Sequence, residues 1–182
     1  AGGAIRVQAG SLVSVGGVLT SGTGSMFLTG ASVDVNAGSL TTGGAGDVVV
    51  RATSGTANVN AGSDAGVAIT TVSGDMLVSA AGNVTTRGVI QASGGAIDIE
   101  STGGAVSLGN GRVQTSGTGT VLVSALSALS MTAAAQIVTG GGDVILAAGT
   151  DLTIGGVDAG AGDVSLRASA GRIAGRADGS VD

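Results

Sequence analysis

The ionisable side chains of this sequence that recur at one position are aspartates at a turn. Asp47, Asp75, Asp143 and Asp163 each follow a glycine and precede a short apolar stretch. If successive repeats stack, these carboxylates become neighbours, and several oxygens together could bind Ca²⁺. The alternative is a turn role, in which each side chain accepts hydrogen bonds from nearby backbone N–H groups. The sequence lacks the Gly-Gly-x-Gly-x-Asp repeat of calcium-binding β-rolls. We therefore favour the turn role and expect no metal or other cofactor.

A carboxylate pair offers a second kind of chemistry. Asp98 and Glu100 lie two residues apart, which places both on one face of a strand. Carboxylate pairs cleave polysaccharides in some enzymes. Here no Arg or Lys cluster and no aromatic platform for a sugar ring accompanies the pair, so we expect no catalytic residues.

Threonine pairs are a third pattern, at 41–42, 70–71 and 85–86. A flat outward array of threonines could bind ice. The pairs do not share one position in the expected repeat, so the sequence favours half-buried strand residues.

Composition excludes several other classes of function. The chain has 182 residues and no His, Cys, Lys, Pro, Trp or Tyr, so thiolate, imidazole and Schiff-base chemistry are absent. The net charge is −5 and the seven arginines are dispersed, which argues against nucleic acid as a partner. No apolar run approaches the roughly 18 residues of a membrane-spanning helix. The composition thus leaves only carboxylate-based chemistry open, since 12 Asp and Glu remain, and we expect a protein that is neither an enzyme nor membrane-spanning.

One repeated motif predicts the strands and turns that carry these residues. The motif is Gly-Asp followed by a short strand with an apolar-x-apolar core. It occurs at 46–52, 74–80, 142–148 and 162–168. Cutting the chain at this motif gives units of 20 to 28 residues, at 4–24, 25–46, 47–74, 75–95, 96–119, 120–142, 143–162 and 163–182. Such a period is typical of a solenoid, whose units bury their apolar faces only by stacking.

Each complete unit contains three short alternating stretches separated by Gly-rich turns. This predicts an all-β fold, a right-handed parallel β-helix (β-solenoid) of about eight coils with three short strands per coil. We expect residues 1–182 to form a single segment, a rod roughly 35–40 Å long. The longest unit, 47–74, should carry an extra loop around 61–66.

The period-two pattern also predicts the core. All sixteen inward positions of the first strand are apolar, which fixes its register: Ile5/Val7, Met26/Leu28, Val48/Val50, Met76/Val78, Ile97/Ile99, Val121/Val123, Val144/Leu146 and Val164/Leu166. The second strand supplies Val13/Val15, Val33/Val35, Ala57/Val59, Val106/Leu108, Leu129/Met131 and Leu152/Ile154. The third strand is more polar, with Thr20, Thr115 and Thr139 near its end.

The outward position between each inward pair is the main candidate for an interaction surface. Stacked coil on coil, this column reads Arg6, Phe27, Val49, Leu77, Asp98, Leu122, Ile145 and Ser165. The five large apolar members, Phe27, Val49, Leu77, Leu122 and Ile145, should meet water, whereas a continuous exposed apolar surface usually marks a contact site. Scattered exposed apolar residues are normal, but a continuous column favours lateral packing on another copy, on adjacent repeats of the same chain or on a covering loop.

The repeat motifs resemble those of filamentous haemagglutinin-type adhesins, which are exported by two-partner secretion. The resemblance rests on Gly-Asp-Val-x-Leu-x-Ala followed by Ser-x-Gly at 162–171, and on 95–104. It implies an extracellular rod attached to the bacterial outer membrane. The secretion domain of such adhesins carries an Asn-Pro-Asn-type motif; with no Pro in this sequence, the chain would be an internal fragment of a longer repeat protein.

Two functions from different classes follow. The first is a structural shaft segment of a large bacterial surface or secreted adhesin, which supports binding regions for cell attachment or biofilm. Host or matrix glycans would then be bound by other regions of the protein. The second is a self-assembling subunit of an extracellular filament or matrix sheet, formed by end-to-end stacking and lateral packing. A polysaccharide-active β-helix enzyme is a distant third.

Overall fold

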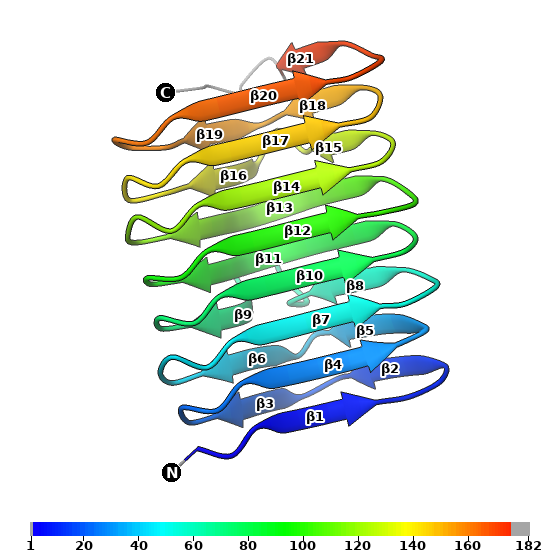
Figure 1. Ribbon diagram of the computed structural model, residues 1–182, viewed down its shortest axis with the longest axis vertical. Coiled ribbons are helices and arrows are strands. Elements are labelled where there is room, and N and C mark those ends of the chain that lie inside the picture. The colour runs from blue at the N-terminus through cyan, green and yellow to red at the C-terminus, as the bar shows by residue number, and fades with distance from the viewer. Residues whose placement is uncertain (1, 176–182) are drawn as a thin grey trace.

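The computed structural model describes residues 2–175, which form strands and turns and no helix. The strands stack as successive coils of a β-solenoid (Figure 1). In Figure 1 the chain crosses the near face from left to right, returns behind it and rises, so the solenoid is right-handed. The expected fold class is confirmed. The end of the last unit, 176–182, lies outside the described residues.

The first strand of each coil joins an eight-stranded parallel sheet, one strand per coil. Its order is β1 (Ile5–Gln8), β4 (Met26–Gly30), β7 (Val48–Ala52), β10 (Met76–Ala80), β12 (Ile97–Ser101), β14 (Val121–Ala125), β17 (Val144–Ala148) and β20 (Val164–Ala168). Register partners follow the predicted alignment, for example Met76 with Val48 and with Ile97. The inward residues of the six middle coils are buried, while those of β1 and β20 are partly exposed.

The second and third strands form a thirteen-stranded sheet behind the first. One column holds β2 (Leu12–Val15), β5 (Ser32–Asn36), β8 (Ala57–Asn60), β11 (Val84–Ala92), β13 (Val106–Thr115), β15 (Leu129–Met131), β18 (Leu152–Ile154) and β21 (Ile173–Gly175). The other holds β3 (Val18–Ser21), β6 (Ser39–Thr42), β9 (Val67–Thr71), β16 (Ala135–Val138) and β19 (Gly156–Asp158). All the predicted second-strand core residues are buried.

Two coils depart in detail from three separate short strands. In β11 and β13 the second and third strands are continuous, and each long strand pairs with both columns. Gly88 and Gly111 lie at the bend with φ of 96° and 137°. Glycine adopts such angles without a steric penalty, so the strand turns the corner, and its pairing resumes beyond the bend after a shift in register.

The third strand ends in buried hydroxyl groups, which settles its register. Ser21, Thr42, Thr71, Thr115 and Thr139 all point inward, so Ser21 takes the place expected for Thr20, which is exposed. Thr42 Oγ1 donates to the Gly46 carbonyl at 2.8 Å, and Thr71 Oγ1 donates to the Gly74 carbonyl at 2.7 Å. The four threonine hydroxyls each donate to a carbonyl of the turn that leads into the next first strand, whereas Ser21 Oγ donates to the Gly3 carbonyl ahead of its own coil's first strand, so each buried polar group is satisfied.

The Gly-Asp motif holds neighbouring coils together at that same turn. A Cβ at Gly74 or Gly95 would overlap the carbonyl oxygen of the equivalent glycine one coil earlier, so only glycine allows this close approach. The aspartate then bonds to the following coil: Asp47 Oδ1 accepts from the Asp75 N–H at 3.0 Å, and Asp75 Oδ1 accepts from the Ala96 N–H at 2.8 Å.

Replacing Gly95 with Ala should lower the thermal unfolding temperature, because the new methyl group must displace the backbone of the preceding coil. Overpacking of this kind costs about 1–3 kcal/mol. Gly17→Ala is the matched control, since nothing lies within 4 Å of a Cβ there. Circular dichroism melts of both variants check the prediction, which fails if Gly95→Ala melts no earlier than Gly17→Ala.

Candidate functional site

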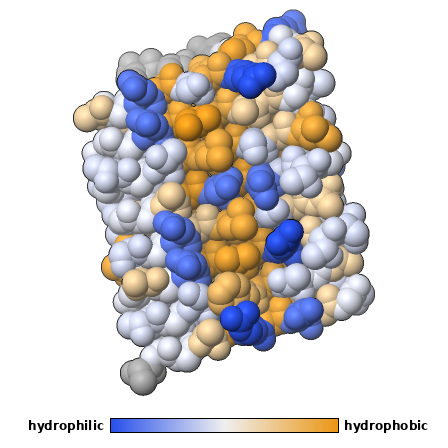
Figure 2. Space-filling view, viewed as in Figure 1, coloured by the Kyte–Doolittle hydropathy of each residue, from blue (hydrophilic) through white to orange (hydrophobic). Residues whose placement is uncertain are grey.

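The outward side of the eight-stranded sheet, here called the front face, carries the candidate packing interface. The register aligns Phe27 with Val49, Val49 with Leu77, and Leu122 with Ile145. Phe27, Val49, Leu77 and Leu122 are half-buried by their neighbours, and 36% of Ile145 is exposed. Figure 2 shows the resulting hydrophobic band along this face, with hydrophilic residues on both sides. The predicted apolar column, defined by Phe27, Val49, Leu77, Leu122 and Ile145, is therefore a surface feature whose outer atoms reach solvent.

Polar residues end and interrupt this column. At its start the Arg6 guanidinium lies 4.3 Å from the centre of the Phe27 ring, a cation–π contact that covers part of the only aromatic side chain. Near its middle the register places Asp98 between Leu77 and Leu122. At its far end Ile145 pairs with Ser165. Asp98 is thus the one charged residue with large apolar partners on both sides.

The Asp98 carboxyl occupies an unfavourable environment. Its Oδ1 atom is buried and has no hydrogen-bond partner among residues 2–175. Burial raises the pKa of Asp98 above its ordinary value, and the neighbouring Glu100 carboxylate raises it further. A shallow hollow beside it is lined by Val49, Leu77 and Asp75. The column therefore becomes more apolar when this one group takes up a proton.

Glu100 has a different environment, although it lies on the same strand. Ser79 Oγ donates to Glu100 Oε1 at 2.7 Å, a bond between adjacent coils. As predicted, Asp98 and Glu100 share the outward face of β12. The two carboxylates therefore differ in environment: Glu100 accepts a hydrogen bond from Ser79, and Asp98 is partly buried among apolar neighbours.

Charges on either side of the apolar column are unevenly distributed. Along the edge where the first strands begin lie the acidic residues Asp47, Asp75, Asp143 and Asp163, which we call the acidic edge. Along the opposite edge lie Arg51 and Arg167, together with Glu100. Within residues 2–175 no ion pair involves Arg51 or Arg167. The front face thus has an apolar centre, an acidic edge and an edge with two unpaired cations.

The acidic edge does not converge into a cation site in the described part of the chain. No group of three or more Asp or Glu residues lies close enough there to hold a metal ion. The Oδ1 atoms of Asp47, Asp75 and Asp143 each accept a backbone N–H of the next coil. Three of the four aspartates therefore accept backbone N–H groups, as the turn role predicts, but these bonds join neighbouring coils instead of closing a single turn.

The threonine pairs are arranged differently from the sequence-based expectation. Thr41 and Thr70 are register partners on the third strand, so these two pairs do share a coil position, while Thr85 lies in the second column. Thr42 and Thr71 are buried and bonded to turn carbonyls. Within residues 2–175 this outward column holds Thr20, Thr41 and Thr70 on three successive coils and continues with Gln91 and Gln114, so the threonine array is limited to those three coils.

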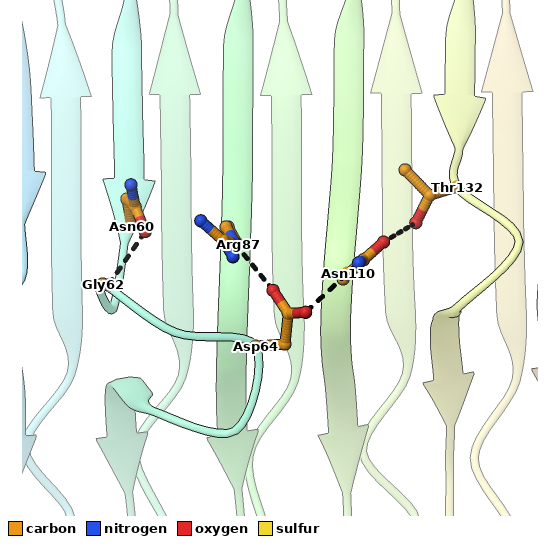
Figure 3. Close-up of polar contacts among 6 residues, drawn as sticks. All are labelled: Asn60, Gly62, Asp64, Arg87, Asn110 and Thr132. Atoms are coloured by element: carbon orange, nitrogen blue, oxygen red, sulfur yellow. Dashed lines mark hydrogen bonds and ion pairs between the residues drawn. The ribbon is translucent and has the colours of Figure 1, made fainter.

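The extra loop of the longest unit spans 61–66, between β8 and β9, as predicted. It carries a polar network that the sequence did not suggest, drawn in Figure 3. Asp64 accepts from Arg87 Nε at 2.6 Å and from Asn110 Nδ2 at 3.2 Å. Thr132 Oγ1 in turn donates to Asn110 Oδ1 at 2.8 Å. The network binds the loop to the next two coils and lowers the pKa of Asp64.

This loop network is structural. The side chains of Arg87 and Asp64 are 48% and 46% exposed, so their ion pair contributes little to stability. Asp64 and Asn110 are 46 residues apart in the sequence. Residues this far apart meet because the coils stack, and no local sequence motif links them. Sequence patterns therefore did not reveal this bond.

Comparison of the chain with family models, with curated proteins and with solved structures gives no match. Residues 2–175 contain no helix long and apolar enough to cross a membrane. The fold and the front face are therefore the observations from which a function has to be argued.

Replacing Asp98 with Asn should stabilise the protein at neutral pH. The raised pKa means that folding penalises the ionised form, so the parent loses stability relative to the variant as the pH rises from about 3.9, the ordinary Asp value, through the folded pKa. Below that ordinary value the penalty disappears. Thermal melts of dilute protein between pH 3 and pH 8 measure the difference. A variant that melts below the parent at pH 7 would contradict the prediction.

Proposed function

We propose that this chain is a non-enzymatic structural shaft segment of a large bacterial surface or secreted adhesin. Its place is outside the cell or at the outer membrane, where it supports binding regions that belong to other parts of the protein. The observation that carries the proposal is the unbroken stack. Every first strand of the described chain pairs with the next in one register, and the apolar core runs through all the coils.

Several features support a mechanical role over a chemical one. The buried hydroxyl groups are bonded to turn carbonyls, and the aspartates at the turns are bonded to the following coil. These groups therefore hold the rod together and are not directed at a ligand. The repeat motif at 162–171 resembles the repeats of filamentous haemagglutinin-type adhesins, and this resemblance supports the extracellular assignment.

Immunogold labelling tests the location and the shaft role together. Antibodies raised against residues 1–182 should label intact, unpermeabilised cells of the source bacterium, at a distance from the outer membrane. Labelling that appears only after the cells are permeabilised would overturn the proposal.

A screen against polysaccharide substrates should show no specific turnover, and any turnover abolished by Asp98→Asn would contradict the non-enzymatic assignment.

The front face favours a second function, lateral association with other β-solenoid surfaces. Its strands are apolar on both faces, a pattern that usually belongs to sheets covered on both sides. In the described chain nothing covers the apolar column except Arg6 at one end. An exposed apolar band of this length usually marks a contact surface. We propose that the column packs against another copy or adjacent repeats, as in an extracellular bundle or sheet.

Changing Leu77, Leu122 and Ile145 together to Thr should weaken this association, because Thr keeps the strand propensity and removes apolar contact area. Analytical ultracentrifugation over a concentration series measures the effect, and electron microscopy shows whether rods bundle. A matched control changes Leu12, Val18 and Leu126 to Thr, since these apolar residues are 54%, 71% and 64% exposed and lie outside the column. Equal association of both variants would exclude the apolar column as the contact.

A further inference from the structure

The charges around the apolar column point to the geometry of a self-association. In a strand, residues i, i+2 and i+4 lie on the same face. Asp47, Val49 and Arg51 thus form one row across the front face, and Asp163, Ser165 and Arg167 form another. Each row has an acid at one end, the column position in the middle and an arginine at the other end.

We propose that two copies of this chain pack front face to front face about a two-fold axis parallel to the rod. This inference rests on the lateral association proposed above and adds its partner and orientation. A rotation about that axis reverses each row. It therefore places Asp47 opposite Arg51 of the second copy and Asp163 opposite Arg167 of the second copy, each contact occurring twice.

Charge complementarity selects this orientation over the other two-fold arrangement. If the rods were antiparallel, the acidic edge of one copy would lie along the acidic edge of the other. The edge facing Arg51 and Arg167 would then offer one carboxylate, Glu100, which already accepts a hydrogen bond from Ser79. Within residues 2–175 neither arginine has an ion-pair partner. Asp47 uses its Oδ1 atom to accept from the Asp75 N–H, and a carboxylate retains further acceptor sites. The parallel arrangement pairs all four charges.

The same rotation places each column residue opposite itself. Phe27, Val49, Leu77, Leu122 and Ile145 each meet their counterparts, so the apolar band is covered along its length. Asp98 meets Asp98 and Arg6 meets Arg6, and these are the two unfavourable contacts. The Asp98 pair weakens the contact while both carboxylates are ionised, so Asp98→Asn should tighten dimerisation at neutral pH.

The front face is large enough for such a contact. Eight strands at about 4.8 Å spacing and five residues at about 3.3 Å each give a face of roughly 35 by 17 Å, or about 600 Å² in projection. Accessible area exceeds projected area because side chains protrude. A stable interface buries about 800 Å² on each partner, so the whole front face, and not the apolar column alone, must take part.

A charge-reversal experiment tests the pairing. Asp163 and Arg167 suit it because the Asp163 side chain makes no bond to another coil in the described chain. Asp163→Arg and Arg167→Asp should each weaken dimerisation about three- to tenfold, the effect of losing two exposed ion pairs. The double variant should restore the parent dissociation constant, measured by sedimentation equilibrium at low salt. A double variant no tighter than either single variant overturns the two-fold arrangement.

An introduced thiol tests the orientation independently, since the chain contains no cysteine. Ser165→Cys should cross-link to itself with a short bismaleimide, because the two copies of this position face each other. Antiparallel rods would place the two thiols at opposite ends of the dimer and give no cross-link, which overturns the inference. Ser14→Cys, exposed on the opposite sheet, is the control and should stay unlinked.

The two sets of outcomes separate this inference from the lateral association on which it rests. If the parent chain dimerises and the Thr variant of the apolar column does not, but charge rescue and the Ser165 cross-link both fail, the two-fold geometry is wrong and lateral association stands. If the parent chain is monomeric at every concentration, both are wrong.

Discussion

Successive coils have to approach each other closely for the solenoid to form. A coil has no core of its own, and its inward residues are buried only when the next coil lies one strand spacing away. That spacing has to be kept at the turns as well as in the strands. Gly74 and Gly95 permit it, because any side chain there would overlap the backbone of the preceding coil.

Polar groups at the turns then fix the stack that close packing allows. The buried hydroxyl of Thr71 satisfies the Gly74 carbonyl, and the Asp75 carboxylate satisfies the Ala96 N–H. Both bonds lie where the ladder of strand hydrogen bonds ends, so backbone groups that would otherwise be unpaired find partners. The polar residues that first suggested chemistry are mostly part of this framework. Function is left to the residues that the framework does not use.

The front face is the clearest such surface. Neither core packing nor turn geometry requires the residues of its apolar column to be apolar, since they point away from the core. Arg51 and Arg167 are likewise free of ion pairs within residues 2–175. A sheet that presents apolar residues and unpaired charges in ordered rows is suited to contact with a second ordered surface. A shaft role and lateral packing are compatible, because rods that bundle still project what they carry.

The coil period, the inward residues of the first two strands, the position of the loop at 61–66 and the outward column all follow from the order of the residues along the chain. Alternation with period two and a recurring Gly-Asp turn are local signals, so they can be read without coordinates. The register of the third strand, where Ser21 and not Thr20 turns inward, and the fusion of strands in β11 and β13 emerge only from the folded stack. It alone also revealed the bond from Asp64 to Asn110, the alignment of Thr41 with Thr70 and the absence of a hydrogen bond at Asp98 Oδ1. These features depend on which residues of neighbouring coils come into contact. Because the coils differ in length, those contacts are fixed only when the coils stack.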